Sequence, residues 1–266
     1  MRKVISNDGT AIAFDQSGQG PVVILVGGAL GDRSASEPLA ALLAQHFTVL
    51  NYDRRGRGES SDTPPYAVAR EIEDLDALIK EGGGSAFVLG GSSGAVLALE
   101  ASARGLAITK LALYEPPFIV DGSRPPLPED YVTQLTEMIA SGQRGDAVAF
   151  FMTRAVGMPA EAIAPMRQAP IWSALEAAAP LSHTLAYDGT IMGDMMSGHP
   201  LPRGKWGSVM VPTLVMDGGA SPPWMRNAVQ ALVDALPHAQ RCTLEDQTHV
   251  VAPEVLAPVL IAFFNG

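Results

Sequence analysis

The chain has 266 residues, of which 47% are hydrophobic and 17% charged, so it can bury a sizeable core and is not expected to be disordered. Acidic residues outnumber basic ones by 28 to 18, a net charge of −10, and no run of Lys and Arg forms a basic patch. This charge balance argues against nucleic-acid binding. The single cysteine, Cys242, excludes an intrachain disulfide and a cysteine-based metal site.

No targeting or membrane segment is predicted. Arg2 and Lys3 stand near the N-terminus, but no apolar stretch follows them, so we expect no signal peptide. The longest apolar run covers residues 255–264 and contains Pro258, far short of the ~20 residues that a membrane span needs. We expect a cytoplasmic monomer or homodimer that acts on a small-molecule substrate and binds neither nucleic acid nor a membrane.

Short apolar runs alternate with segments of helical spacing along most of the chain. The apolar runs predict strands at residues 11–14, 22–26, 48–52, 86–89, 111–114, 211–216 and 241–244. Helical spacing predicts helices at residues 37–47, 68–80, 94–104, 224–236 and 253–264. Strands that alternate with helices of this length indicate βαβ units and a largely parallel sheet.

The alternation stops between residues 116 and 207, where no strand is predicted. Helix-like pieces fill this stretch, at residues 129–141, 145–156, 160–168, 172–179 and 182–196. We expect them to form a helical lid inserted into a core domain of residues 1–115 and 208–266. Most of the methionines and aromatic residues of the lid should form its own core, and some should line an apolar pocket.

A candidate nucleophile follows the predicted strand at residues 86–89. The sequence there reads Gly90-Gly91-Ser92-Ser93-Gly94 and leads directly into a helix. A G-x-S-x-G pattern in this context places Ser92 on a sharp, exposed turn, and the N–H of Ser93 at the helix start can stabilise an oxyanion. A Gly/Ser linker, or Ser93 as the nucleophile, would also fit the residue types, but the glycines are not centred on Ser93.

The candidate base is His249, one of five histidines. It follows the last predicted strand, in a loop just before the final helix, and so falls at the carboxyl edge of the sheet, where α/β ligand sites lie. A helix-capping or surface role is the alternative for His249. The other four histidines stand at a helix end, in the lid or in a surface turn: His46, His183, His199 and His238.

These residues make the chain resemble α/β-hydrolase-fold proteins over nearly its full length. The resemblance rests on Gly27-Gly28, the stretch of residues 53–60, the Ser92 turn and Thr248-His249. It implies the α/β-hydrolase fold, which is a mostly parallel sheet of about eight strands flanked by helices, with an inserted helical lid. The chain order of serine before histidine agrees with that family.

Two further features come from the resemblance. Relatives usually read His-Gly after the third strand, whereas this chain reads Gly27-Gly28-Ala29. The position implies that the backbone N–H of Ala29 is the second oxyanion donor. The run Asp53-Arg54-Arg55-Gly56 is implied to be a structural turn without a catalytic role.

Two carboxylates are candidates for the acid that would complete a catalytic triad. Ser221 occupies the place where the family usually carries its acid, and a hydroxyl cannot stabilise an imidazolium as a carboxylate does. Glu115 ends the strand that precedes the lid, in the place from which certain haloalkane dehalogenases take their acid. Asp217, at the tip of the strand of residues 211–216, is the alternative. Pro116 favours an extended backbone at Glu115.

A serine nucleophile argues against the dehalogenases and epoxide hydrolases of this fold, which use Asp. The sequence therefore predicts hydrolysis of carboxylic esters or lactones through an acyl-enzyme. Three alternatives stay open: a C–C bond hydrolase, a cofactor-free perhydrolase and a non-catalytic ligand receptor. No metal or organic cofactor is expected, because the histidines and carboxylates lack ligand spacing.

Overall fold

The computed structural model describes residues 1–168 and 181–266, and the helix predicted at residues 172–179 lies outside them. In these ranges eight strands form one sheet. They are β1 (Arg2–Ile5), β2 (Ala11–Ser17), β3 (Val22–Val26), β4 (Thr48–Tyr52), β5 (Ala86–Gly91), β6 (Ile108–Tyr114), β7 (Thr213–Gly218) and β8 (Ala239–Leu244). Their spatial order is β1-β2-β4-β3-β5-β6-β7-β8. The pairs β1–β2 and β2–β4 are antiparallel and the others are parallel.

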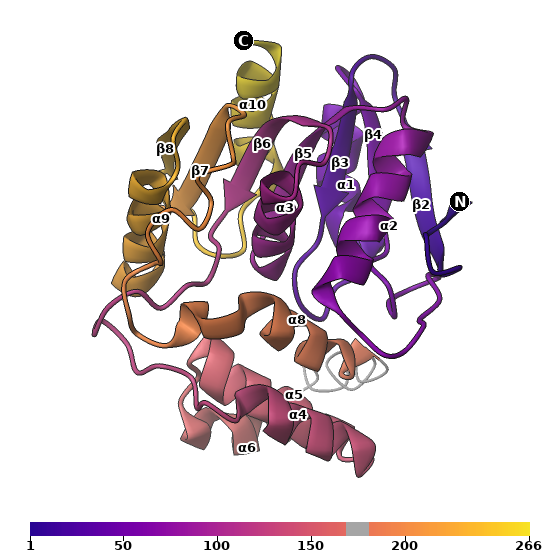
Figure 1. Ribbon diagram of the computed structural model, residues 1–266. Coiled ribbons are helices and arrows are strands. Elements are labelled where there is room, and N and C mark those ends of the chain that lie inside the picture. The colour runs from indigo at the N-terminus through magenta and orange to yellow at the C-terminus, as the bar shows by residue number, and fades with distance from the viewer. Residues whose placement is uncertain (169–180) are drawn as a thin grey trace.

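Helices cover both faces of this sheet (Figure 1). One face carries α2 (Val68–Glu81), α3 (Ser93–Ala103) and α9 (Pro223–Ala235), and the other carries α1 (Glu37–Leu43) and α10 (Pro253–Asn265). Side chains of β3 alternate between the two layers, as the period of two requires. Ile24 and Val26 belong to the core under α2, α3 and α9, whereas Val23 and Leu25 belong to the core under α1 and α10.

A group of helices lies between β6 and β7 in the chain. It contains α4 (Tyr131–Ala140), α5 (Arg144–Phe151), η2 (Met152–Val156), α6 (Ala160–Gln168), α8 (Thr184–Met192) and η4 (Gly193–Met196). We call these segments the helical insertion. Figure 1 shows them beyond the carboxyl edge of the strands, with α8 between the sheet and α4. The insertion has an apolar core of its own, which includes Tyr131, Leu135, Val148 and Leu185.

The predicted fold class, a mostly parallel sheet of about eight strands flanked by helices, is confirmed. Several strands differ from their predicted extent: β2, β6 and β8 are longer than predicted, and β7 begins and ends two residues later. β1 was not predicted, because two of its four residues are charged and it pairs only along the sheet edge with β2. β5 continues through Gly90 and Gly91, which pair with Leu113 and Tyr114 of β6. Within the described ranges, no helix is long and apolar enough to cross a membrane.

Candidate active site

Ser92 lies on a tight turn between β5 and α3. Its backbone has φ 56° and ψ −127°, a region that residues other than glycine rarely adopt and that marks strain at functional positions. Its N–H donates to the carbonyl oxygen of Tyr114 at 2.9 Å. A Cβ on Gly90 would lie 2.6 Å from Ala95 Cα, and one on Gly94 would lie 2.3 Å from the carbonyl oxygen of Val26. Only glycine fits at these two positions, so the G-x-S-x-G spacing follows from packing around Ser92.

His249 and Glu115 meet at the same edge of the sheet. Nδ1 of His249 lies 2.7 Å from Oε2 of Glu115. The Glu115 side chain is completely buried, whereas the His249 side chain keeps 37% of its surface exposed. One ring nitrogen of His249 is thus held by a buried carboxylate, and the ring still borders the cavity that Ser92 lines. The structure brings together all three residues that the sequence favoured for a triad.

Glu115 reaches His249 through a backbone conformation that the sequence did not predict. Pro116 led us to expect an extended backbone at Glu115, but its φ is +43°, so that expectation was wrong. Two contacts with β7 stabilise the turn: the N–H of Glu115 donates to Met216 O at 2.9 Å, and Gly218 N–H donates to Glu115 Oε1 at 2.8 Å. These bonds outweigh the local preference of a residue before proline.

The loop that carries His249 is fixed by close contacts with β6 and β7. A Cβ on Gly218 would lie 2.3 Å from the carbonyl oxygen of Gln247, so only glycine allows β7 to pass this loop. On the other side, the hydroxyl of Tyr114 donates to the carbonyl oxygen of Thr248 at 2.5 Å. Strand ends on both sides therefore define the position of the imidazole.

Asp217, the alternative acid, is directed away from His249. It is fully buried, and its carboxylate accepts hydrogen bonds from Arg241 Nη2 at 2.6 Å and Thr243 Oγ1 at 2.9 Å. Both partners lie on β8, so the carboxylate links β7 to β8. Ser221, in the usual place of the acid, is also buried, and its hydroxyl has no hydrogen-bond partner among the described residues.

A cavity of about 280 Å³ separates this edge of the sheet from the helical insertion. Ser92 and His249 line it, together with the two predicted oxyanion residues, Ala29 and Ser93. Most of the other lining residues are apolar and come from the insertion and from α9: Tyr131, Phe151, Leu185, Met192, Met196, Trp224 and Met225. We call this space the insertion cavity.

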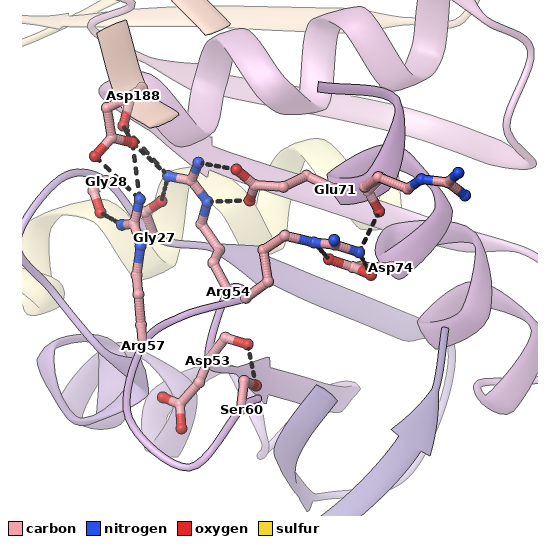
Figure 2. A network of polar contacts seen from close by, with 12 residues as sticks. Gly27, Gly28, Asp53, Arg54, Arg57, Ser60, Glu71, Asp74 and Asp188 are labelled. Carbon is pink, nitrogen blue, oxygen red and sulfur yellow. Dashed lines mark hydrogen bonds and ion pairs between the residues drawn. The ribbon is translucent and has the colours of Figure 1, made fainter. Parts of the chain in front are cut away.

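A network of buried charges surrounds the turn that follows β4 (Figure 2), and Arg54 Nη1 donates to the hydroxyl of Ser93 at 3.4 Å. The side chains of Arg54, Arg55 and Arg57 are at most 1% exposed. Arg54 forms a two-pronged ion pair with Glu71 at 2.7 and 2.8 Å, and Arg55 pairs in the same way with Asp74 at 2.8 and 2.7 Å. Such geometry matches the planar guanidinium group. The turn at residues 53–56, which was expected to be structural, therefore supplies two arginines to a network of buried ion pairs.

Asp188 of α8 connects the helical insertion to this network. Its carboxylate accepts from Arg54 Nη1 at 2.8 Å, from Arg57 Nη2 at 2.9 Å and from the hydroxyl of Ser93 at 2.8 Å. Burial raises the pKa of Asp188, but the neighbouring Arg57 and Arg54 charges outweigh burial and hold the pKa below its ordinary 3.8. Asp188 also lines the insertion cavity.

The sequence reasoning missed Asp188. The available signal was that Asp188 is the only charged residue of α8, because a charge that becomes buried needs a partner. Its arginine partners lie 131 to 134 residues earlier in the chain, and their proximity depends on the docking of α8.

The same arginines hold the backbone that precedes Ala29. Arg57 Nη1 donates to the carbonyl oxygen of Gly28, and Arg54 Nη1 donates to that of Gly27 at 3.3 Å (Figure 2). In a planar trans peptide the C=O and the following N–H point in opposite directions. By holding Gly28 O, Arg57 therefore turns the Ala29 N–H away from the arginines.

No metal cluster accompanies these groups: in residues 1–168 and 181–266, no three His, Cys, Asp or Glu side chains are grouped so that they could hold an ion.

Comparisons with known proteins identify the family and the fold of the chain. The model of a family described as "Alpha/beta hydrolase family" matches residues 22–259. The solved structure of an alpha/beta hydrolase from Sphaerobacter thermophilus DSM 20745 is 56% identical, with a TM-score of 0.90 over 99% of this chain and 100% of that chain. The enol-lactonase from Burkholderia xenovorans LB400 shares the fold at 22% identity, with a TM-score of 0.73 and 100% of both chains covered.

A curated relative matches over a shorter stretch. The uncharacterized hydrolase YraK of Bacillus subtilis (strain 168) is 36% identical over 96 residues, which are 35% of this chain and 35% of that protein. The match therefore spans about a third of the relative's length.

Proposed function

Because the chain belongs to the alpha/beta hydrolase family, we propose that it is a serine hydrolase that cleaves carboxylic esters or lactones of small, apolar substrates. The observation that carries this proposal is the 2.7 Å contact between His249 Nδ1 and Glu115 Oε2 at the cavity that Ser92 also lines. A nucleophile, a base and an orienting carboxylate are the three parts that acyl transfer through a serine needs.

In the proposed reaction Ser92 Oγ attacks the substrate carbonyl while His249 Nε2 takes the hydroxyl proton. Glu115 accepts the hydrogen bond from Nδ1–H, which fixes the tautomer and stabilises the imidazolium that forms. His249 then gives the proton to the leaving oxygen, and an acyl-enzyme remains on Ser92. A water molecule, activated by the same histidine, releases the acid and restores the free serine.

The oxyanion of each tetrahedral intermediate would bind to the backbone N–H groups of Ser93 and Ala29. Ser93 is the first residue of α3, and the first N–H groups of a helix have no partner within the helix. The direction of the Ala29 N–H follows from the contact between Arg57 and Gly28 O. Such preorganised donors lower the barrier because they need no reorientation during the reaction.

The apolar lining of the insertion cavity supports uncharged substrates. Among the described residues that line it, the one carboxylate is Asp188, which is already paired with two arginines and offers no free charge to a ligand. We further propose that the segment of residues 116–207 acts as a lid on a core of residues 1–115 and 208–266. The solved relatives of the same fold include an esterase from Exiguobacterium antarcticum and the enol-lactonase, which is consistent with this substrate class.

The test compares the wild-type protein with Ser92→Ala on a panel of p-nitrophenyl esters and lactones. We expect wild-type turnover and a loss on the order of 10⁴-fold or more in the variant, with an unchanged melting temperature because alanine fits the same space. Ser93→Ala is the matched control: it removes the neighbouring hydroxyl but leaves Ser92 in place, so the variant should still cleave the esters. Turnover of vinylogous diketones or peroxide-dependent turnover without ester cleavage would contradict the proposal, as would a tenth of the activity remaining in Ser92→Ala.

A further inference from the structure

A second cavity borders Ser92 and His249, on the α1 and α10 side of the sheet. It measures about 240 Å³ and lies between the end of β3, α1 and the start of α10. Gly27, Leu39, Tyr114 and Leu256 form walls on different sides of it. We call it the Gly27 chamber. Because Ser92 and His249 line both cavities, the two spaces meet at the proposed reaction centre.

The neighbouring glycines Gly27 and Gly28 differ in what their missing side chains would meet. A Cβ on Gly28 would lie 3.0 Å from Ser92 Cβ, whereas a Cβ on Gly27 would have no atom within 4 Å. Gly27 also has no left-handed φ. Close packing thus accounts for the glycine at position 28, but neither packing nor backbone conformation requires one at position 27.

The direction of the open space follows from β3. Val23 and Leu25 of β3 face the core of α1 and α10, and Gly27, the residue after the end of β3, lines the chamber together with Leu25. A side chain at this position would enter the chamber and fill part of it. An unfilled apolar cavity lowers the stability of the fold. A protein keeps such a destabilising cavity where its function needs the space. The chamber is therefore interpreted as room for a ligand.

The lining of the chamber defines the kind of group that fits. The lining residues include Leu25, Leu39, Leu89, Val251 and Leu256, and within residues 1–168 and 181–266 no Asp, Glu, Lys or Arg lines the chamber. A charged group would lose its hydration there without gaining a partner. Because an apolar cavity of about 150 Å³ is large enough for benzene, the chamber has room for a phenyl ring or a short branched alkyl group.

We propose that the Gly27 chamber binds one of the two substituents of the scissile carbonyl, an uncharged alkyl or aryl group, while the insertion cavity binds the other. This inference rests on the proposed ester or lactone hydrolysis and narrows its substrates to those with apolar groups on both sides of the carbonyl. With Ser92 between the two cavities, such a substrate places its carbonyl at the nucleophile and its two arms in separate spaces.

The experiment uses three esters: methyl acetate, methyl phenylacetate and benzyl acetate. The last two are isomers that carry the same ring on the acyl side or on the alcohol side. Acid release in a pH-stat gives kcat/KM for each, and the ratio to methyl acetate measures how well each side accommodates the ring. We expect Gly27→Val to lower one of these two ratios by roughly tenfold or more and to leave the melting temperature equal or higher.

Further variants separate the chamber from other effects. Ala35 also lines the chamber, so Ala35→Leu should narrow it without a change at Gly27 and should lower the same ratio as Gly27→Val. Ala155→Leu narrows the insertion cavity and should lower the other ratio. Gly122→Val is the matched control, since a Cβ there also meets no atom within 4 Å and the position borders neither cavity; both ratios should equal those of the wild type.

The inference is overturned if Gly27→Val and Ala35→Leu change neither ratio. It is also overturned if they lower the rates for all three esters by one common factor, because Gly27 would then act through the backbone of the Ala29 loop. Failure of the proposed function gives a different result, in which wild-type protein cleaves none of the three esters.

Discussion

Glu115 and His249 are separated by 134 positions in the chain, yet their side chains lie 2.7 Å apart. The two residues come from adjoining parts of one sheet edge: Glu115 follows β6, and His249 stands in the loop after β8. Strand β7 lies between them and contacts both: the N–H of Gly218 donates to Glu115 Oε1, and Gly218 packs against Gln247 of the loop that carries His249. The orientation of the proposed base therefore depends on three neighbouring strands.

The contact predicts different effects for the two candidate acids. Glu115→Gln keeps the shape of the side chain but removes the charge, so we expect kcat to fall by up to ~10⁴-fold at saturating ester. Asp217→Asn should keep most of the activity, because Asp217 pairs with Arg241 and Thr243. It should instead lose about 1–3 kcal/mol of unfolding free energy, measured by urea denaturation. A less active Asp217→Asn than Glu115→Gln would reverse the assignment.

We predict that the folded protein loses stability in acid as Asp188 becomes protonated. Its pKa is below 3.8 in the folded protein, so its carboxylate stabilises the fold above the unfolded value and loses this contribution as pH falls through the folded value. Asp188→Asn leaves the buried Arg57 without its carboxylate partner, whereas Arg54 keeps its ion pair with Glu71. Removing one member of a buried ion pair costs about 3–5 kcal/mol. Melting temperatures from pH 7 to pH 2 should show a lower plateau and a shallower decline below pH 4 in the variant. An equally steep decline would contradict this role.

We predict that a substitution of Arg57 lowers kcat, because Arg57 holds the loop that carries Ala29. Arg57→Lys cannot contact both Gly28 O and Asp188 in the same fork-like way, so the Ala29 N–H should lose its fixed direction. Because the loss of one oxyanion donor costs about 10²–10³ in kcat, we expect a decrease toward the lower end of that range with little change in KM.

Arg55→Lys is the control for this prediction. Arg55 is also buried but pairs with Asp74 and Asp8, away from the Gly28 carbonyl. It should lose stability without a matching loss in kcat. Equal kcat values for Arg55→Lys and Arg57→Lys would show that burial alone, and not the contact with Gly28, accounts for the effect.

From the close packing of Gly218 against the His249 loop, we predict that the loop tolerates no side chain at position 218. The Cβ of Gly218→Ala would approach Gln247 O to 2.3 Å, so the loop has to shift and His249 with it. A displacement of this kind should lower kcat/KM by about 10²-fold. At Gly219 the closest contact of an added Cβ is 3.3 Å, so Gly219→Ala should have the smaller effect. Similar rates for both variants would show that the loop adapts freely.

The sequence was informative where local patterns decide the structure. The apolar runs located most strands, and the glycine spacing around Ser92 reflects contacts with Ala95 and Val26 that any such turn makes. Glu115 was favoured because Ser221 leaves the usual place of the acid without a carboxylate. The strands and the Ser92 turn needed only neighbouring residues, whereas the choice of Glu115 also needed the resemblance to the α/β-hydrolase family.

The remaining features depend on packing between distant segments. The conformation of Glu115 follows from its bonds to β7, which outweigh the preference set by Pro116. Asp188 joins the arginine network only because α8 docks on α3 and α2. The departure to Gly27 was visible in the sequence, but the chamber beside it exists only through the placement of α1 and α10.

The central claim, that Ser92 is an activated nucleophile, is tested most directly by covalent labelling. Wild-type protein is treated with a small alkyl fluorophosphonate, digested, and analysed by mass spectrometry to locate the added phosphonyl group. The account predicts one modification per chain on Ser92, none in Ser92→Ala, and labelling slowed by orders of magnitude in His249→Ala. Modification of Ser93, or an unlabelled wild-type protein that is folded by its melting curve, would contradict it.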